Sequence, residues 1–100
     1  MMDLNLEDTV VQIEAILSAS TGTEVLAIDE YSGICFSLSG SGKLIWESTE
    51  EPIRVRDICH RLRRRYKVDE AICAAETLAY VNVLVSEKLL RVIPSETKAE

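Results

Sequence analysis

The sequence predicts a small α+β domain, in which a three-stranded antiparallel meander is followed by three helices. Three observations carry this prediction. The first part of the chain holds short apolar runs with a period of two, separated by glycine-containing turns. From about residue 54 to residue 87, apolar residues recur at helical spacing instead. A chain of 100 residues also suits one domain with a modest core. We expect that domain over residues 10–93, with tails at residues 1–9 and 94–100.

The first predicted strand covers residues 10–18, where apolar residues alternate along the chain. The odd positions from 11 to 17 are all apolar, and the segment has four β-branched aliphatic residues, which favours a strand. A helix is the alternative, because Leu6, Val10, Ile13 and Leu17 also fall at helical spacing.

Two further strands follow at residues 24–29 and 33–38, and Gly22 and Gly33 lie in the turns before them. We expect Leu26 and Ile28 on one face of the sheet. The last of the three strands precedes the helical part of the chain. It can therefore lie at an edge of the sheet and offer its unpaired backbone groups to a partner.

Three helices and a short strand complete the predicted order. Small residues at 39–42 open a short helix that ends before Pro52, and its Trp46 is expected to cover the apolar face of the sheet. The next helix buries one stripe, formed by Val55, Ile58, Cys59, Leu62 and Tyr66. Asp69 is the expected N-cap of the third helix, residues 70–87. That helix is apolar on two sides, so it is either central or awaits a partner. Residues 89–93 are expected to form a short strand, and the tail from Pro94 onward to be disordered.

Charge is distributed unevenly along the chain. The net charge is −6, yet the segment from Arg54 to Lys67 holds seven basic residues and one acidic residue. An acidic chain is repelled by nucleic acid unless a basic face is well isolated. No apolar run approaches the length of about 20 residues that spans a bilayer, and the first residues lack the features of a signal peptide. We therefore expect a cytoplasmic protein without a membrane partner.

The sequence offers little for chemistry. Cys35, Cys59 and Cys73 form no framework or zinc-ligand pattern, so we expect three buried, reduced thiols and no metal. Cys59 and His60 are adjacent on a helix, where their side chains point about 100° apart. No catalytic set, phosphate-binding loop or paired carboxylates are recognisable, so we expect no catalytic residue and no cofactor.

The order of motifs resembles a known family. An Asp-x-x-x-Gly turn (29–33) is followed by a strand ending in Leu38, by small residues and by Ile45–Trp46. Val55–Ile58, Tyr66, Val68, Asp69 and the later leucines continue the pattern. This arrangement resembles the PqqD-like RiPP recognition elements, and the resemblance covers residues 24–93. It implies a winged helix-turn-helix-like fold. Arg54 stands where the family usually has a Ser or Thr cap, and Lys88 where it often has a glycine.

The resemblance also implies a function: a peptide-binding adaptor that captures the leader segment of a ribosomally synthesised precursor peptide by β-strand addition. The adaptor then delivers the precursor to a modifying enzyme or a cysteine protease, with lasso peptide biosynthesis as the favoured setting. The leader would lie between the third strand and the third helix. The residues implied as peptide-binding are Ile34, Cys35, Phe36 and Ser37 on the strand, and Cys73, Glu76, Thr77, Tyr80 and Val83 on the helix.

Other readings stay open beside this one. A winged-helix DNA-binding regulator is the alternative function, using the basic helix at residues 54–67. Against it, such folds read DNA with their last helix, and here that helix holds Glu70, Glu76 and Glu87. The basic helix is otherwise a solvated face or a dock for the partner enzyme. We expect a monomer or a weak dimer, depending on whether the N-terminal strand pairs within its own chain.

Overall fold

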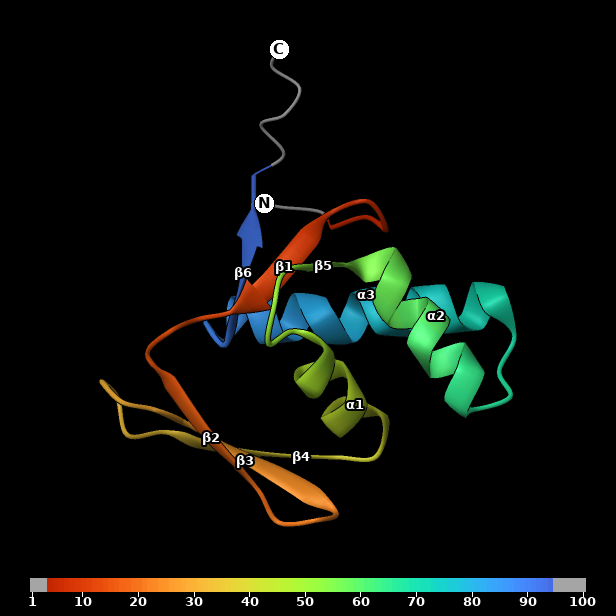
Figure 1. Cartoon of the computed structure of the whole chain (residues 1–100). Coiled ribbons are helices and arrows are strands. Elements are labelled where there is room, and N and C mark those ends of the chain that lie inside the picture. The colour runs from red at the N-terminus through yellow and green to blue at the C-terminus, as the bar shows by residue number, and fades with distance from the viewer. Residues whose placement is uncertain (1–3, 95–100) are drawn as a thin grey trace.

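Two small antiparallel sheets and three helices make up the domain (Figure 1). The computed structural model describes residues 4–94. One sheet is a meander in the order β2 (Ile16–Ser20), β3 (Glu24–Asp29) and β4 (Cys35–Ser39). In the other sheet, β1 (Thr9–Gln12) lies between β5 (Ile53–Arg54) and β6 (Leu90–Ile93). The helices are α1 (Ser41–Ser48), α2 (Val55–Arg65) and α3 (Glu70–Ser86). The predicted fold class, a three-stranded meander followed by three helices, is confirmed.

The prediction of one strand over residues 10–18 was wrong in its extent. The segment is extended rather than helical, but it forms two strands, β1 and β2, in different sheets. A turn separates them, in which the Ile16 N–H donates to the Ile13 carbonyl at 3.0 Å. The N–H groups of Gln12 and Ile13 donate to the carbonyls of Thr49 and Leu89, so these residues still belong to the surroundings of β1, and the break comes after Ile13. The continuous alternation in the sequence concealed this break.

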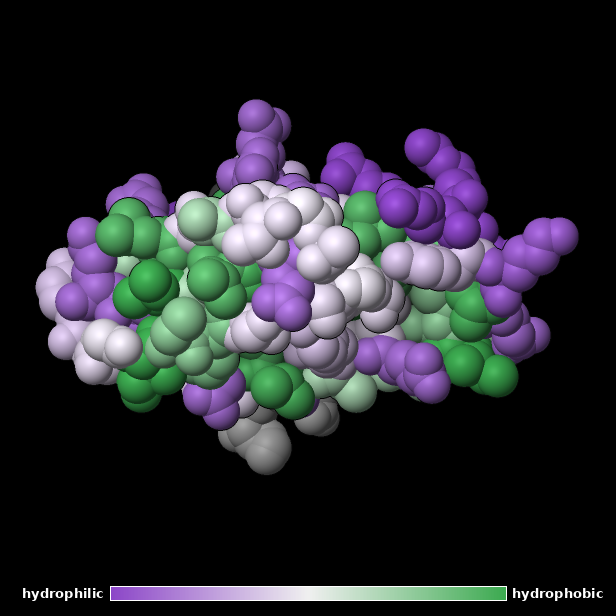
Figure 2. All heavy atoms as spheres, turned by 90° about the horizontal axis from the view of Figure 1, so that it is seen from below, coloured by the Kyte–Doolittle hydropathy of each residue, from purple (hydrophilic) through white to green (hydrophobic). Residues whose placement is uncertain are grey.

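The meander turns one face to the core, and Leu26 and Ile28 lie together on the opposite face. Val25 and Ala27 are buried, whereas Ile28 is 41% exposed and Leu17 is 54% exposed. The register pairs Leu17 with Ile28, so both side chains stand on the outer face of the sheet. Figure 2 views the molecule from that side and shows apolar side chains gathered over the sheet. Both faces of these strands carry apolar residues, so alternation alone could not decide which one is buried.

The three helices close the core over both sheets. Trp46 of α1 is fully buried, and α2 buries Val55, Ile58, Cys59 and Leu62. Tyr66 is the C-cap of α2 and is 40% exposed, so its expected place in the buried stripe was wrong. The carboxylate of Asp69 accepts from the N–H groups of Ala71 and Ile72 at 3.0 and 3.2 Å, as expected of an N-cap.

The end of α3 leads directly into β6, as expected from residues 89–93. Lys88 has a φ of +66°, the left-handed conformation that closes many helices. The N–H groups of Lys88 and Leu89 donate to the carbonyls of Val85 and Leu84 at 3.0 and 2.9 Å. These two hydrogen bonds together form a Schellman motif. Lys88 thus occupies the conformation that the resemblance led us to expect of a glycine.

The N-terminal segment packs on its own chain. Leu4 and Leu6, in the expected tail at residues 1–9, are partly buried against the core, and Thr9 already begins β1. β1 pairs with β5 and β6 of the same chain. Of the expected tail at 94–100, residues 95–100 lie outside the described part of the chain. Within residues 4–94, no helix has the length and apolar character that crossing a membrane requires.

Candidate functional site

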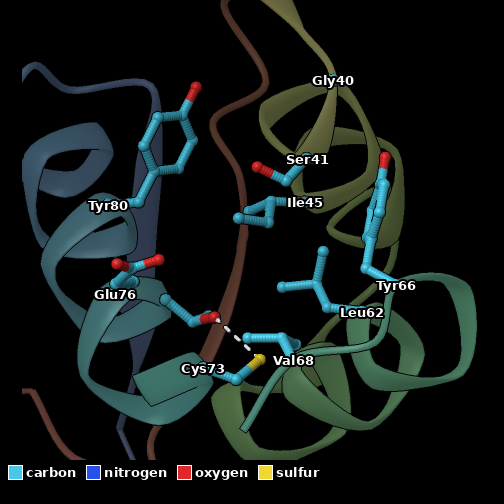
Figure 3. A pocket seen from close by; sticks show the side chains of 10 residues that line it. Gly40, Ser41, Ile45, Leu62, Tyr66, Val68, Cys73, Glu76 and Tyr80 are labelled. Atoms are coloured by element: carbon cyan, nitrogen blue, oxygen red, sulfur yellow. Dashed lines mark hydrogen bonds between the residues drawn. The ribbon is translucent and has the colours of Figure 1, made fainter.

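A cavity of about 430 Å³ opens between the start of α1, the end of α2 and one face of α3 (Figure 3). Ten residues line it, contributed by the three helices, the residue before α1 and the α2–α3 connection: Gly40, Ser41, Ile45, Leu62, Tyr66, Val68, Cys73, Glu76, Thr77 and Tyr80. Gly40 and Ser41 directly follow β4, so the cavity lies at the C-terminal end of that strand.

One wall of the cavity is a stripe along α3. Cys73, Glu76, Thr77 and Tyr80 are spaced by three and four residues, which places them on one side of the helix. Cys73 and Thr77 are buried at its base, with Sγ and Oγ1 3.8 Å apart. Glu76 is exposed at the rim. The base of the stripe is therefore small and weakly polar, and its charge lies at the opening.

Tyr80 is the largest side chain of this stripe and is half-buried. Burial raises the pKa of its hydroxyl above the ordinary value of a tyrosine. The hydroxyl therefore stays protonated at neutral pH and can donate a hydrogen bond to a ligand. Its ring supplies apolar area beside that donor, a combination common at protein interfaces.

The opposite wall is apolar. Ile45 and Leu62 are buried, while Tyr66 and Val68 lie at the junction between α2 and α3. In Figure 3 these side chains face Cys73, Glu76 and Tyr80 across the cavity. Such a lining selects a ligand mainly by shape and apolar contact.

The strand next to the cavity has a free edge. β4 pairs with β3 and with no other strand among residues 4–94. The Asp29 N–H donates to the Ile34 carbonyl at 3.0 Å, which sets the alternation along the pair. Phe36 and Leu38 therefore direct their backbone groups toward β3, and Cys35 and Ser37 direct theirs toward the open edge. An extended polypeptide alongside β4 would find these groups unpaired.

The residues implied by the resemblance fall into two groups. Cys73, Glu76, Thr77 and Tyr80 line the cavity. The other helix residue, Val83, continues the same stripe one turn further and is 53% exposed. The strand residues do not line the cavity: Phe36 packs partly against the core, Ile34 and Cys35 are exposed, and the Ser37 hydroxyl donates to Glu24 at 3.1 Å. The expectation of three buried thiols was therefore wrong for Cys35, because its side chain stands on the outer face of an edge strand.

Several lining residues were missed as site residues. Ile45, Leu62 and Tyr66 were interpreted as parts of buried helix faces, and Val68 was noted only as part of a motif. Helix ends can contribute to the core and to a cavity at once, and periodicity does not distinguish the two uses. The run of small residues at 39–42 was the available signal, because small residues at a helix start leave room beside the strand that precedes it.

The cavity and the strand edge suit the binding of a ligand. Among residues 4–94, no group of three or more His, Cys, Asp or Glu side chains is placed to hold a metal ion. Burial raises the pKa of the Cys59 thiol, which disfavours the thiolate that a nucleophile needs. His60 is exposed, and its Nδ1 lies 3.8 Å from the carboxylate of Asp57 on the surface of α2. Cavity and strand edge together offer shape and backbone hydrogen bonds.

Comparisons with known proteins agree with this description. A family model described as coenzyme PQQ synthesis protein D (PqqD) matches residues 24–90. The solved structure "TbiB1 in Complex with the TbiA(beta) Leader Peptide" is 26% identical, with a TM-score of 0.77, and the match covers 81% of this chain and 94% of that one. A second structure, "Lasso peptide synthetase B1 complexed with the leader peptide", is 20% identical, with a TM-score of 0.72 over 85% of this chain and 98% of that one. That second match shows likeness of fold alone. A search of curated proteins found no match.

Proposed function

Because this chain belongs to the PqqD family, we propose that it is a non-catalytic adaptor that binds the leader segment of a ribosomally synthesised precursor peptide. The relative TbiB1, which shares the fold over nearly its whole length, is described in complex with a leader peptide. The observation that carries the proposal is the free edge of β4, which ends beside an apolar cavity.

In this proposal the leader adds to the β2-β3-β4 sheet as a fourth strand next to β4. The backbone groups of Cys35 and Ser37 supply the hydrogen bonds, each with a net value of about 0.5–1.5 kcal/mol. Such bonds do not read sequence, so specificity comes from side chains of the leader that enter pockets. The cavity between Tyr80, Ile45 and Leu62 would take an apolar or aromatic side chain. Val83 and Ile34 extend the apolar surface that such a strand would cover.

The adaptor would then present the precursor to a second protein. We propose that this second protein is a modifying enzyme or a cysteine protease that removes the leader, and that the setting is lasso peptide biosynthesis. Ribosomes make the precursor in the cytoplasm, and we propose that the adaptor binds it there. We propose that it acts there as a monomer or a weak dimer, since the N-terminal strands pair within their own chain.

The alternative role in DNA binding is not favoured. The exposed arginines lie on α2, whereas winged-helix proteins place their last helix in the major groove. The last helix here carries acidic residues, Glu70 and Glu76, and offers few donors to base edges.

A binding titration tests the proposal. The probe is the leader of the precursor encoded beside this gene, labelled with a fluorophore, and a scrambled peptide of the same composition serves as reference. We expect saturable binding of the leader only. Tyr80→Ala should weaken it at least about tenfold, a loss of about 1.4 kcal/mol. Ile72→Ala is the control, because Ile72 is an exposed apolar residue of α3 outside the cavity. Equal binding of leader and scrambled peptide would contradict the proposal.

A further inference from the structure

The basic residues of α2 are not all in the same situation. Arg54 and Arg56 pair with Glu7, and Arg63 lies 4.0 Å from Glu70. In contrast, Arg61, Arg64, Arg65 and Lys67 form no ion pair within residues 4–94. The negative end of the α2 dipole favours basic residues in the last turn of the helix, so it accounts for part of this cluster. It does not account for Arg61, which lies a full turn before the last helical residue.

Three of these unpaired arginines share a concave surface. Arg61, Arg64 and Arg65 line a depression of about 360 Å³ together with Leu44 of α1. Leu44 is partly buried and packs against the core, so the depression has an apolar floor and a basic rim. A shape of this kind is suited to a polypeptide, which has both carboxylates and apolar stems, and less to a free ion.

The depression adjoins the cavity described above. Three residues of the depression are followed directly in the sequence by a residue that lines the cavity: Leu44 precedes Ile45, Arg61 precedes Leu62, and Arg65 precedes Tyr66. Successive helical residues point about 100° apart. The pairs Leu44–Ile45 and Arg61–Leu62 are helical, so the two concave surfaces occupy neighbouring sides of α1 and α2. Tyr66 is the extended C-cap of α2, and it directly follows Arg65 in the chain.

We propose that Arg61, Arg64 and Arg65 bind an acidic stretch of the same peptide whose apolar side chain enters the cavity. The inference rests on the proposed function and adds the chemical class of the ligand: a peptide with carboxylates close to its apolar anchor. Charge supports this occupant, because the whole chain has a net charge of −6 in spite of its basic segment. An acidic peptide is repelled by the rest of the surface and attracted here, which orients it during binding.

The test uses a random library of displayed 20-residue peptides, selected for binding to the full chain at about 50 mM salt, where surface charges are weakly screened. One enriched peptide is synthesised in two forms, as selected and with every Asp and Glu replaced by Asn and Gln. Affinities of both are measured for the wild type, for Tyr80→Ala, for R61Q/R64Q/R65Q and for the control R54Q/R56Q/R91Q. Binding of random duplex DNA to the wild type and to R61Q/R64Q/R65Q is measured in parallel. Both triple variants remove three positive charges, but only the first removes them beside the cavity.

We expect the enriched peptides to be acidic. The acidic form should bind the wild type about tenfold more tightly than the neutral form, because each exposed ion pair between a carboxylate and an arginine contributes only a small binding free energy. R61Q/R64Q/R65Q should bind both forms equally, and the control should keep the difference. Peptides that need Tyr80 but show no preference for acids would overturn this inference and leave the proposed function intact. If no peptide is enriched, the proposed function fails. Loss of random duplex DNA binding in R61Q/R64Q/R65Q, with peptide binding unchanged, would assign the cluster to nucleic acid and overturn the inference.

Discussion

The ring of Tyr80 lies against the backbone of Gly42, so that α3 and α1 meet at the edge of the cavity. A Cβ atom at Gly42 would overlap the Tyr80 hydroxyl and lie 3.0 Å from Cζ. Gly42 is buried at the first turn of α1 and has no left-handed φ. The reason for a glycine at this position is therefore space for Tyr80, and the backbone conformation does not require it.

The first prediction concerns this contact. Gly42→Ala should destabilise the wild type by about 1–3 kcal/mol, because the added methyl group overpacks the interface. In a Tyr80→Ala background the same substitution should stabilise by about 0.5–1 kcal/mol, the usual advantage of alanine in a helix. Denaturant unfolding of the four proteins measures both effects. The same sign in both backgrounds would show that Tyr80 is not the constraint.

The second prediction separates the two sides of β4. Proline at Cys35 removes an N–H that points to the open edge, so the variant should fold and lose at least about tenfold in leader binding. Proline at Phe36 removes an N–H that points toward β3 and should destabilise the sheet itself. Circular dichroism melts and the leader titration are the measurements. Normal binding by a folded Cys35→Pro variant would exclude β4 as the binding edge.

The third prediction concerns Lys88, which lies outside the candidate site. A non-glycine residue in the left-handed conformation is strained, and glycine is not. Lys88→Gly should therefore raise the free energy of unfolding by up to about 1 kcal/mol and leave leader binding unchanged. A decrease in stability would mean that the lysine side chain contributes more than its backbone strain costs.

The fourth prediction concerns alkaline pH. Burial raises the pKa of the Cys59 thiol above its ordinary value of 9.0 and that of Tyr80 above 10.0. The unfolded chain therefore releases these protons at lower pH than the folded chain. The contribution of the two groups to the free energy of unfolding is fully present below about pH 9 and is lost as pH rises through the raised pKa values. Urea unfolding between pH 7 and 10.5 should show this decline. In Cys59→Ala the decline should begin about one pH unit higher, and an unchanged onset would exclude Cys59 as its cause.

Much of the fold could be predicted from the sequence, because its local signals agree with the final structure. β3 begins and ends as predicted, and Asp69 caps α3. The second sheet could not be predicted in this way. Its strand β5 has two residues, and its order, β5-β1-β6, joins segments from the beginning, middle and end of the chain. Such long-range pairing leaves no periodic pattern in any one segment.

The candidate site was predicted on one side only. The face of α3 with Cys73 and Tyr80 stood out because that helix is apolar around more of its circumference than a surface helix needs. The facing wall was not found, because Ile45 and Leu62 have the spacing of ordinary core residues. Only the packing of α1 against α2 and α3 leaves a space next to them.

Amide hydrogen exchange along β4 tests the central claim most directly. In the free protein, the amides of Phe36 and Leu38 bond to β3 and should exchange slowly, whereas those of Cys35 and Ser37 face the open edge and should exchange fast. Saturating leader peptide should slow Cys35 and Ser37 strongly and change Phe36 and Leu38 little. If the leader binds and the amides of Cys35 and Ser37 still exchange as fast as before, the peptide does not add to this strand, and the account is wrong.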